Sequence, residues 1–469
     1  MGRSDATSSS PVGRLSNELL SSILLQVKLD SGAPSFLPCL LCCKAWYGVA
    51  LPLLYHDVVL SHTNLEPFVQ HLKVSTGSLV RSLTLRIDPV RPELEPDAPH
   101  PYAFLEDEED MRRHGSQGSQ RLWGHLRDIA TTLANMVGLI SFSLYISPEK
   151  NNVGFWLPRS AIAAIIEALP ESCVNLEIDS RGNDSSEPDS AHLCDAVSAT
   201  LPRLQNLRLR LSTMCPAIFG AGFDSSAPAK FFSNFQPVAT STLQTVLINC
   251  VPGNIFGSRA SICGPSQESL YDHWSEPDPQ AYFAFVDCLR LGVARLCYPA
   301  AKRLSVVMAL PHDNADQAVY PALLRGDILE NQASVLPFRN IIGMRSNDGY
   351  LVRTFDDQEI FTYPWVVDAL VEDKFWAETK DGYRLPAMLL GTESTLYAVD
   401  HMPIQSTGEW KVKYPRIGCG LWSNERMTES RLLQAERREG LKDVTPIKEK
   451  TPPGFHRIYE GSDLERDTP

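Results

Sequence analysis

The stretch LPRLQNLRLRL at positions 201–211 decides how most of the chain folds. Its first leucines are three residues apart, and Leu207, Leu209 and Leu211 then alternate with polar residues. Alternation is typical of a β-strand, and the wider spacing before it is typical of the turn that leads into a strand of a repeat protein. The stretch therefore predicts one unit of a strand-and-helix repeat.

The same alternation recurs in five other segments of the chain. They lie at 83–87, 142–146, 174–178, 246–250 and 304–308. Helical patterns at 121–136, 160–169, 191–201 and 281–297 fill several of the gaps. Strand, turn and helix at a recurring step predict an α/β fold, interpreted here as an irregular solenoid with parallel strands on one face. A plain α/β domain with a parallel sheet gives much the same pattern and stays open as the alternative.

The repeated units resemble leucine-rich repeats, most closely at 201–211. The resemblance implies an irregular leucine-rich-repeat-like α/β region over 61–338, with strands that line a concave binding face. Arg208 and Arg210 alternate with the leucines and are therefore candidates for contact with a protein target. The alternative is that both are solvated charges at the edge of the strands.

The charge of the chain is concentrated in one segment. The 469 residues include 43 Lys and Arg against 56 Asp and Glu, a formal charge of −13. Residues 88–110 contain nine acidic residues and one basic residue, Arg91, and so contribute −8. We expect an acidic, Pro-rich insertion at 88–118 that aids solubility or contacts a basic partner. With no basic stripe, the sequence argues against binding to nucleic acid or an anionic membrane surface.

The cysteines and the N-terminus predict a cytoplasmic or nuclear protein. The 11 cysteines are odd in number and lie mostly in apolar segments, which is typical of reduced thiols. Residues 1–13 have no apolar core of a signal peptide and are predicted to be disordered. The apolar run at 36–55 contains Lys44 and two prolines, so it is interpreted as a buried helix, not a membrane span.

The C-terminal part of the chain has a different character. Asn347-Asp348-Gly349-Tyr350 and Lys380-Asp381-Gly382-Tyr383 are hairpin-turn signals, and 410–414 alternates like a strand. Residues 339–422 are therefore predicted to form a small β-rich module or a cap on the solenoid. Mixed charges follow at 423–469, which predicts a helix to about residue 441 and then a disordered tail.

No segment carries a catalytic or phosphate-binding motif, and no cofactor or metal is predicted. The spacing Cys39-x2-Cys42-x13-His56-x5-His62 matches a generic zinc finger. However, the cysteines fall in an apolar helical run and the histidines flank a strand-like Val58-Val59-Leu60, so core cysteines are the preferred interpretation.

The N-terminus resembles the F-box family. LSNELLSSIL at 15–24 is similar to the opening of that motif, and LLCCKAWYGVA at 40–50 is similar to its close. LPLLYHDVVL at 51–60 resembles the continuation common in fungal F-box proteins. Ser16 stands where the family usually has Pro. The resemblance covers 14–60, about a tenth of the chain. Independently of it, the apolar spacing at 15–27 predicts a helix that ends at the break in residues 30–34, and a second helical run follows to about residue 50 and ends at Pro52.

This resemblance implies a non-catalytic substrate receptor of an SCF-type cullin-RING ubiquitin ligase. It implies a Skp-type adaptor and a cullin scaffold as partners, and an unknown protein target bound by the C-terminal region. The adaptor-binding candidates by this analogy are Leu15, Leu19, Leu20, Ile23, Leu24, Lys44 and Trp46. For each of them a role in the helical core is an equal alternative. The competing interpretations are a scaffold that delivers no substrate and an enzyme domain at 339–422. Only a cluster of aromatic residues in 339–422 favours the enzyme domain, and a role in the core is the preferred interpretation of that cluster.

Overall fold

The fold is given by a computed structural model. It describes residues 15–87, 122–146, 157–185, 192–221, 236–251, 260, 262–263, 280–310, 322–340, 350–353, 359–362, 368, 371–373, 375–379, 382–390, 405–406 and 448–450. The predicted insertion at 88–118, the strand at 410–414, the disordered N-terminus at 1–13 and the helix at 423–441 lie outside these residues. Within the described part, no helix combines the length and apolar character that a membrane span needs.

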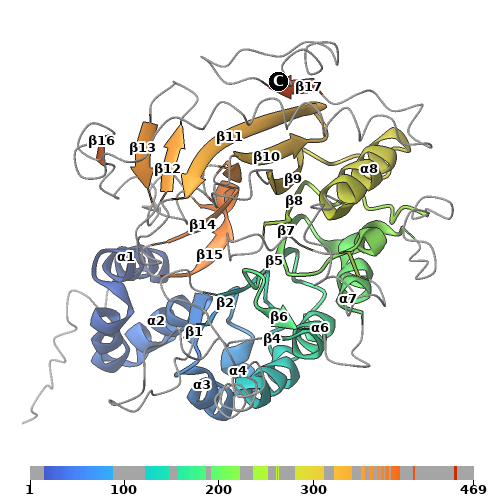
Figure 1. The fold of residues 1–469 in the computed structure, drawn as a ribbon. Helices are drawn as coiled ribbons and strands as arrows, with labels where there is room; N and C mark the ends of the chain where they lie inside the picture. Colours follow the sequence, from blue (N-terminus) through green and yellow to red (C-terminus); the bar gives the residue numbers. More distant parts are fainter. Residues whose placement is uncertain are drawn as a thin grey trace, which may run out of the picture.

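A large sheet of thirteen strands forms the centre of the molecule (Figure 1). Seven strands at one end pair in parallel in the order β1-β2-β3-β5-β7-β8-β9. Their bounds are β1 (Asp57–Ser61), β2 (Ser82–Ile87), β3 (Ser141–Ile146), β5 (Asn175–Asp179), β7 (Asn206–Arg210), β8 (Thr245–Asn249) and β9 (Arg303–Leu310). The predicted α/β class and the six repeated strands are confirmed.

The alternating leucines form the core because successive side chains of a strand point to opposite faces. In the observed register Leu207 pairs with Leu176 on one side and Val246 on the other. Leu209 likewise pairs with Ile178 and with Ile248. All of these side chains are fully buried. Each parallel strand therefore adds two apolar residues to one continuous core.

Helices cover the apolar face of this sheet (Figure 1). They are α3 (Leu65–His71), α4 (Val74–Gly77), a helix at 122–133, α6 (Arg159–Ala168), α7 (Leu193–Thr200) and α8 (Gln280–Ala294). The short 3₁₀ turns η3 (Leu201–Arg203) and η4 (Pro216–Phe219) flank β7. The predicted helical patterns are confirmed, and their apolar residues join the strand residues in one cluster.

Antiparallel strands extend the sheet beyond β9. They are β10 (Ala322–Asp327), β11 (Gln332–Asn340), β12 (Tyr350–Arg353), β13 (Glu359–Thr362) and β16 (Gln405–Ser406), while β17 (Lys448–Lys450) pairs in parallel with β11. β11 crosses the boundary predicted at residues 338 and 339. The described strands of the C-terminal part are thus continuous with the sheet of the preceding region.

A hairpin of β14 (Trp376–Glu378) and β15 (Arg384–Pro386), followed by η7 (Ala387–Leu389), lies against the sheet on the side away from the helices (Figure 1). Gly382 has a φ of +84°, which fits the turn predicted at 380–383. We call the described residues between 368 and 390 the closing segment. A second small sheet pairs β4 (Leu157–Pro158) with β6 (Asp184–Ser185).

Two helices precede the sheet, α1 (Asn17–Cys42) and α2 (Lys44–His56). The expected helix break at 30–34 is wrong, because α1 continues through this stretch, and so is the expected end at Pro52, because α2 runs on to His56. Proline removes one backbone hydrogen bond but does not forbid a helix whose flanks are held by packing. Leu53 and Leu54, directly after Pro52, pack against the core of the two helices.

Candidate functional site

The N-terminal helices pack on a small core of their own. Leu20 and Leu24 of α1 lie with Phe36 and with Ala50 of α2, and all four are buried. Ser16 caps α1, because its Oγ accepts a hydrogen bond from the Leu19 N–H at 3.4 Å. The serine at this position therefore satisfies one of the free N–H groups at the start of the helix.

The seven adaptor-binding candidates divide between the core and the surface of the helical pair. Leu20 and Leu24 are core residues with almost no exposed area, and Trp46 is half-buried against the same cluster. The other four are exposed: Lys44, Leu15, Leu19 and Ile23. We define these three apolar residues, Leu15, Leu19 and Ile23, as the α1 outer face.

The α1 outer face follows from helical geometry. Leu19 and Ile23 are four positions apart on α1, a spacing that aligns side chains along one side of a helix, and Leu15 directly precedes the N-cap residue Ser16. Leu19 is 57% exposed and Ile23 is 45% exposed, although large apolar side chains such as leucine and isoleucine are usually buried. The start of α1 therefore carries both buried and exposed apolar side chains, and the intramolecular core uses only the buried ones.

A buried lysine joins the helical pair to the sheet. Lys28 Nζ donates a hydrogen bond to the Leu53 carbonyl at 2.8 Å and lies 3.5 Å from the Asp57 carboxylate. These contacts connect α1 to α2 and to the first residue of β1. They hold the α1 outer face in a defined position relative to the parallel sheet.

The polar face of the sheet carries a buried network of charges. Arg208 of β7 donates to Glu177 at 2.7 Å and to Asp179 at 2.8 Å, both on β5. It also makes two parallel hydrogen bonds, of 2.9 and 2.8 Å, to Glu372 of the closing segment. A fork-to-fork contact of this kind is the strongest ion-pair geometry that arginine forms.

Arg210 is held in the same way. It donates to Asp368 at 2.7 Å and to the Val251 carbonyl, and Arg181 also reaches Asp368 at 3.1 Å. The prediction that Arg208 and Arg210 contact a target or are solvated is therefore wrong, since they are 2% and 1% exposed. The closing segment covers both arginines. Its acidic residues are about 160 positions away in the sequence, so local alternation could not predict these ion pairs.

The hairpin of the closing segment extends the network toward β3. Arg384 makes two hydrogen bonds to the Glu177 carboxylate and stacks over the Tyr145 ring at 4.4 Å. Tyr145 in turn donates to Glu378 at 2.9 Å. Burial, and then the Glu378 carboxylate, raise the pKa of Tyr145, so the phenol stays protonated and acts as a donor.

Two acidic members of the network, Asp179 and Asp368, have pKa values below the usual range of a carboxyl group. Burial alone would raise the pKa of Asp179, but Arg208, Arg210 and Arg181 outweigh it and hold that pKa well below its usual range. Asp368 has a lowered pKa for the same reason, because Arg210 and Arg181 overcome the effect of burial. The polar face is therefore a satisfied set of ion pairs and not an open catalytic or binding surface.

The aromatic residues that motivated an enzyme domain at 339–422 are partly accounted for. Phe375 and Trp376 are buried in the closing segment, and Arg303 lies 5.2 Å from the centre of the Phe375 ring. Phe355, Tyr363, Trp365, Trp410 and Trp422 lie outside the described residues.

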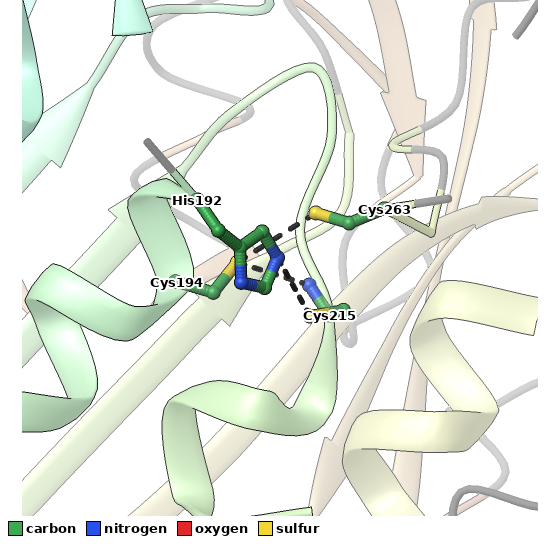
Figure 2. A group of neighbouring side chains, drawn as sticks. All are labelled: His192, Cys194, Cys215 and Cys263. Atoms are coloured by element: carbon green, nitrogen blue, oxygen red, sulfur yellow. Dashed lines mark hydrogen bonds between the residues drawn. The ribbon is translucent and has the colours of Figure 1, made fainter. Parts of the chain in front are cut away.

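One group of possible metal ligands lies on the helix-covered side, away from the charge network (Figure 2). It consists of His192 and Cys194 at the start of α7, Cys215 before η4, and Cys263. One ligand atom from each lies within 4.8 Å of all the others. Among the described residues no other group of three or more His, Cys, Asp or Glu meets this condition.

The sequence did not reveal this group. The spacings His192-x-Cys194, Cys194-x20-Cys215 and Cys215-x47-Cys263 match no short metal motif. The His-x-Cys pair at a helix start was the one local signal. The residues with zinc-finger spacing form no metal-ligand group: Cys39 and Cys42 lie on α1, and His56 lies 3.0 Å from the Asp57 carboxylate. The prediction of core cysteines is wrong for Cys42, which is exposed, because this side of α1 does not face the core of the two helices.

The chain was also compared with known proteins. Neither the protein-family models nor the curated proteins include a match to it.

Proposed function

We propose that this chain is the substrate-recognition subunit of an SCF-type ubiquitin ligase and that the α1 outer face binds a Skp-type adaptor. The observation that carries the proposal is the division of the apolar residues at the start of α1, and just before it, into buried and exposed ones. Leu20 and Leu24 complete the core, whereas Leu15, Leu19 and Ile23 remain exposed. Together with the F-box resemblance at 14–60, this division supports a helical module that both folds and binds.

The proposed contribution to ubiquitination is proximity. A receptor holds its target near a ubiquitin-conjugating enzyme bound elsewhere in the complex, which raises the local concentration of target lysines. It supplies no catalytic group. In the proposal, Lys28 and its contacts with Leu53 and Asp57 transmit the position of the adaptor to the sheet.

We further propose that the parallel region is a leucine-rich-repeat-like solenoid. Its support is the strand order, which follows the chain order from β1 to β9 without reversal. A doubly wound α/β domain reverses its strand order at a switch point. In the solenoid interpretation, each new unit adds a strand at the same edge and a helix or turn on the same face.

The test is binding of the full chain to a purified Skp-type adaptor by calorimetry. We expect Leu19→Asp with Ile23→Asp to weaken binding at least tenfold, because both changes place a charge in an apolar contact. Leu296→Asp is the matched control, since Leu296 is 83% exposed and distant in sequence from α1. Circular dichroism of all variants checks that the fold is kept.

Two results would reject the adaptor proposal. One is that the unmodified chain, shown to be folded, does not bind the adaptor. The other is that Leu19→Asp with Ile23→Asp binds as well as Leu296→Asp does.

A scaffold function that delivers no substrate is the second candidate. It is favoured by the closing segment, which already occupies the polar face that a solenoid would offer to a target. The two functions differ in cells: for a receptor, deleting residues 15–60 lengthens the half-life of a protein bound by the rest of the chain. For a scaffold, that half-life is unchanged.

A further inference from the structure

We propose that His192, Cys194, Cys215 and Cys263 bind one zinc ion in a closed, structural site. The proposal is independent of the proposed ubiquitin-ligase function, because it concerns the helix-covered side of the sheet and not α1. It rests on the geometry of four side chains that come from three separate parts of the chain (Figure 2).

The distances fit a tetrahedral ion. Zinc bound to sulfur at about 2.3 Å places two sulfur ligands about 3.8 Å apart. Cys194 Sγ and Cys263 Sγ are 3.7 Å apart, and His192 Nε2 lies 3.3 Å from Cys215 Sγ. Figure 2 shows the four side chains gathered at one place and joined by dashed contacts, and their ligand atoms all lie within 4.8 Å of one another. Four ligand atoms so arranged can surround a single ion without a large rearrangement.

The surroundings of the ligands also fit a metal site. His192 Nδ1 lies 3.0 Å from the Asp195 carboxylate, one helical turn further along. A carboxylate in this position keeps the proton on Nδ1 and leaves the Nε2 lone pair free for the metal. The Cys215 backbone N–H donates to Cys194 Sγ at 3.3 Å, which stabilises a thiolate at that sulfur.

The ligand set selects zinc and a structural role. Three thiolates and one imidazole are the Cys₃His set of structural zinc sites, in which all four positions are taken by protein. Three thiolates and Zn²⁺ together leave a net charge of only −1.

Zinc would connect distant parts of the chain. Cys194 lies on α7 and Cys215 lies between β7 and η4, whereas Cys263 lies 48 residues beyond Cys215. Binding would release the thiol protons and would cross-link these parts, so the binding free energy would add to the stability of the fold. The site would hold the segment with Cys263 against the outer surface of two neighbouring units.

The test begins with the full chain, purified under reducing conditions without chelator. We expect about one zinc per chain by elemental mass spectrometry. After removal of the zinc, added Co²⁺ should give the visible absorption of a tetrahedral ion and the near-ultraviolet band of thiolate-to-cobalt charge transfer. A folded chain that contains no zinc and gives neither cobalt band would overturn the proposal, as would a chain that contains iron instead.

Variants identify the ligands. We expect Cys194→Ser, Cys215→Ser and Cys263→Ser each to lower the zinc content and to reduce the cobalt charge-transfer band. Cys173→Ser is the matched control, because Cys173 is also buried but its thiol faces the Asn175 carbonyl at 3.6 Å. Full zinc content in all three variants would place the metal elsewhere and reject this site.

Two further measurements cover variants that fail to fold. His192→Asn changes a partly exposed ligand, and we expect it to weaken zinc retention against a competing chelator at least tenfold while the chain stays folded. Peptide mapping without reductant tests the alternative of a Cys194–Cys263 disulfide. That disulfide, found in a zinc-free chain purified under reducing conditions, would also overturn the proposal.

Discussion

At the scale of single residues, Arg208 is the point on which the buried charges of the polar face converge. Its guanidinium contacts three carboxylates, two from the neighbouring strand β5 and one from the closing segment. Desolvation alone would lower the pKa of Arg208, but Glu372, Asp179 and Glu177 raise it, so the side chain stays charged. Without the Arg208 guanidinium, three buried carboxylates would lose a cation that balances their negative charge.

We therefore expect Arg208→Met to lower the free energy of unfolding by about 3–5 kcal/mol. Removing one partner of a buried ion pair leaves the other charges buried without compensation. Urea denaturation followed by circular dichroism measures the change. Arg127→Met is the control, since Arg127 is exposed on the helix at 122–133, and it should cost less than about 1 kcal/mol. Equal effects of the two changes would contradict this role of Arg208.

At the scale of elements, the 3₁₀ turn η4 ends on a glycine that no other residue can replace without strain. Gly220 has a φ of +89°, in the left-handed region. A Cβ at this position would lie 2.1 Å from the Gln236 carbonyl oxygen and 3.0 Å from the Val238 nitrogen. Both neighbours are backbone atoms, so they cannot move aside as a side chain could.

Gly220→Ala should lower the free energy of unfolding by about 2–4 kcal/mol, which combines left-handed strain with the steric contact. Gly124→Ala is the matched control, because it lies in a helix with no atom within 4 Å of a new Cβ. It should be neutral or stabilising by up to about 1 kcal/mol. Thermal unfolding of the two variants side by side measures the difference, and a Gly220→Ala chain as stable as the parent would refute the steric argument.

The elements also show how far local pattern determines structure. The apolar alternation predicted the repeated strands, and the helical pattern predicted α6, α7 and α8, since both depend on local periodicity and core burial. The pattern did not predict that α1 and α2 continue through prolines. The two helices continue because residues such as Phe36, Leu53 and Leu54 pack in the core between them. Local helix propensity gives no information about this packing.

At the scale of the whole molecule, the closing segment makes stability depend on pH. Asp179 and Asp368 have pKa values lowered by arginines in the folded state. Their unfolded pKa is about 4, so the folded state holds fewer protons than the unfolded state as the pH falls. The stability that they contribute is fully present above that value and is lost at lower pH.

The free energy of unfolding should therefore fall steadily as the pH is lowered from about 5 to about 3. Urea titrations across this range measure the slope. Asp368→Asn removes one of the two carboxylates and should give a shallower slope than the parent, together with lower stability at neutral pH. Identical slopes would mean that Asp368 does not contribute to the pH dependence.

By itself, the sequence determined the alternation of strands and helices and the apolar core, because both depend on periodicity over a few residues. Which apolar residues at the start of α1 are buried and which are exposed was decided by the tertiary structure. Arg208 and Arg210 were different. Their alternation with leucine correctly placed them on the polar face, but only the tertiary structure brought Asp368 and Glu372 onto them from about 160 residues away. His192, Cys194, Cys215 and Cys263 likewise come together only in the tertiary structure. Contacts between distant parts depend on how the chain packs as a whole, and no local spacing encodes them.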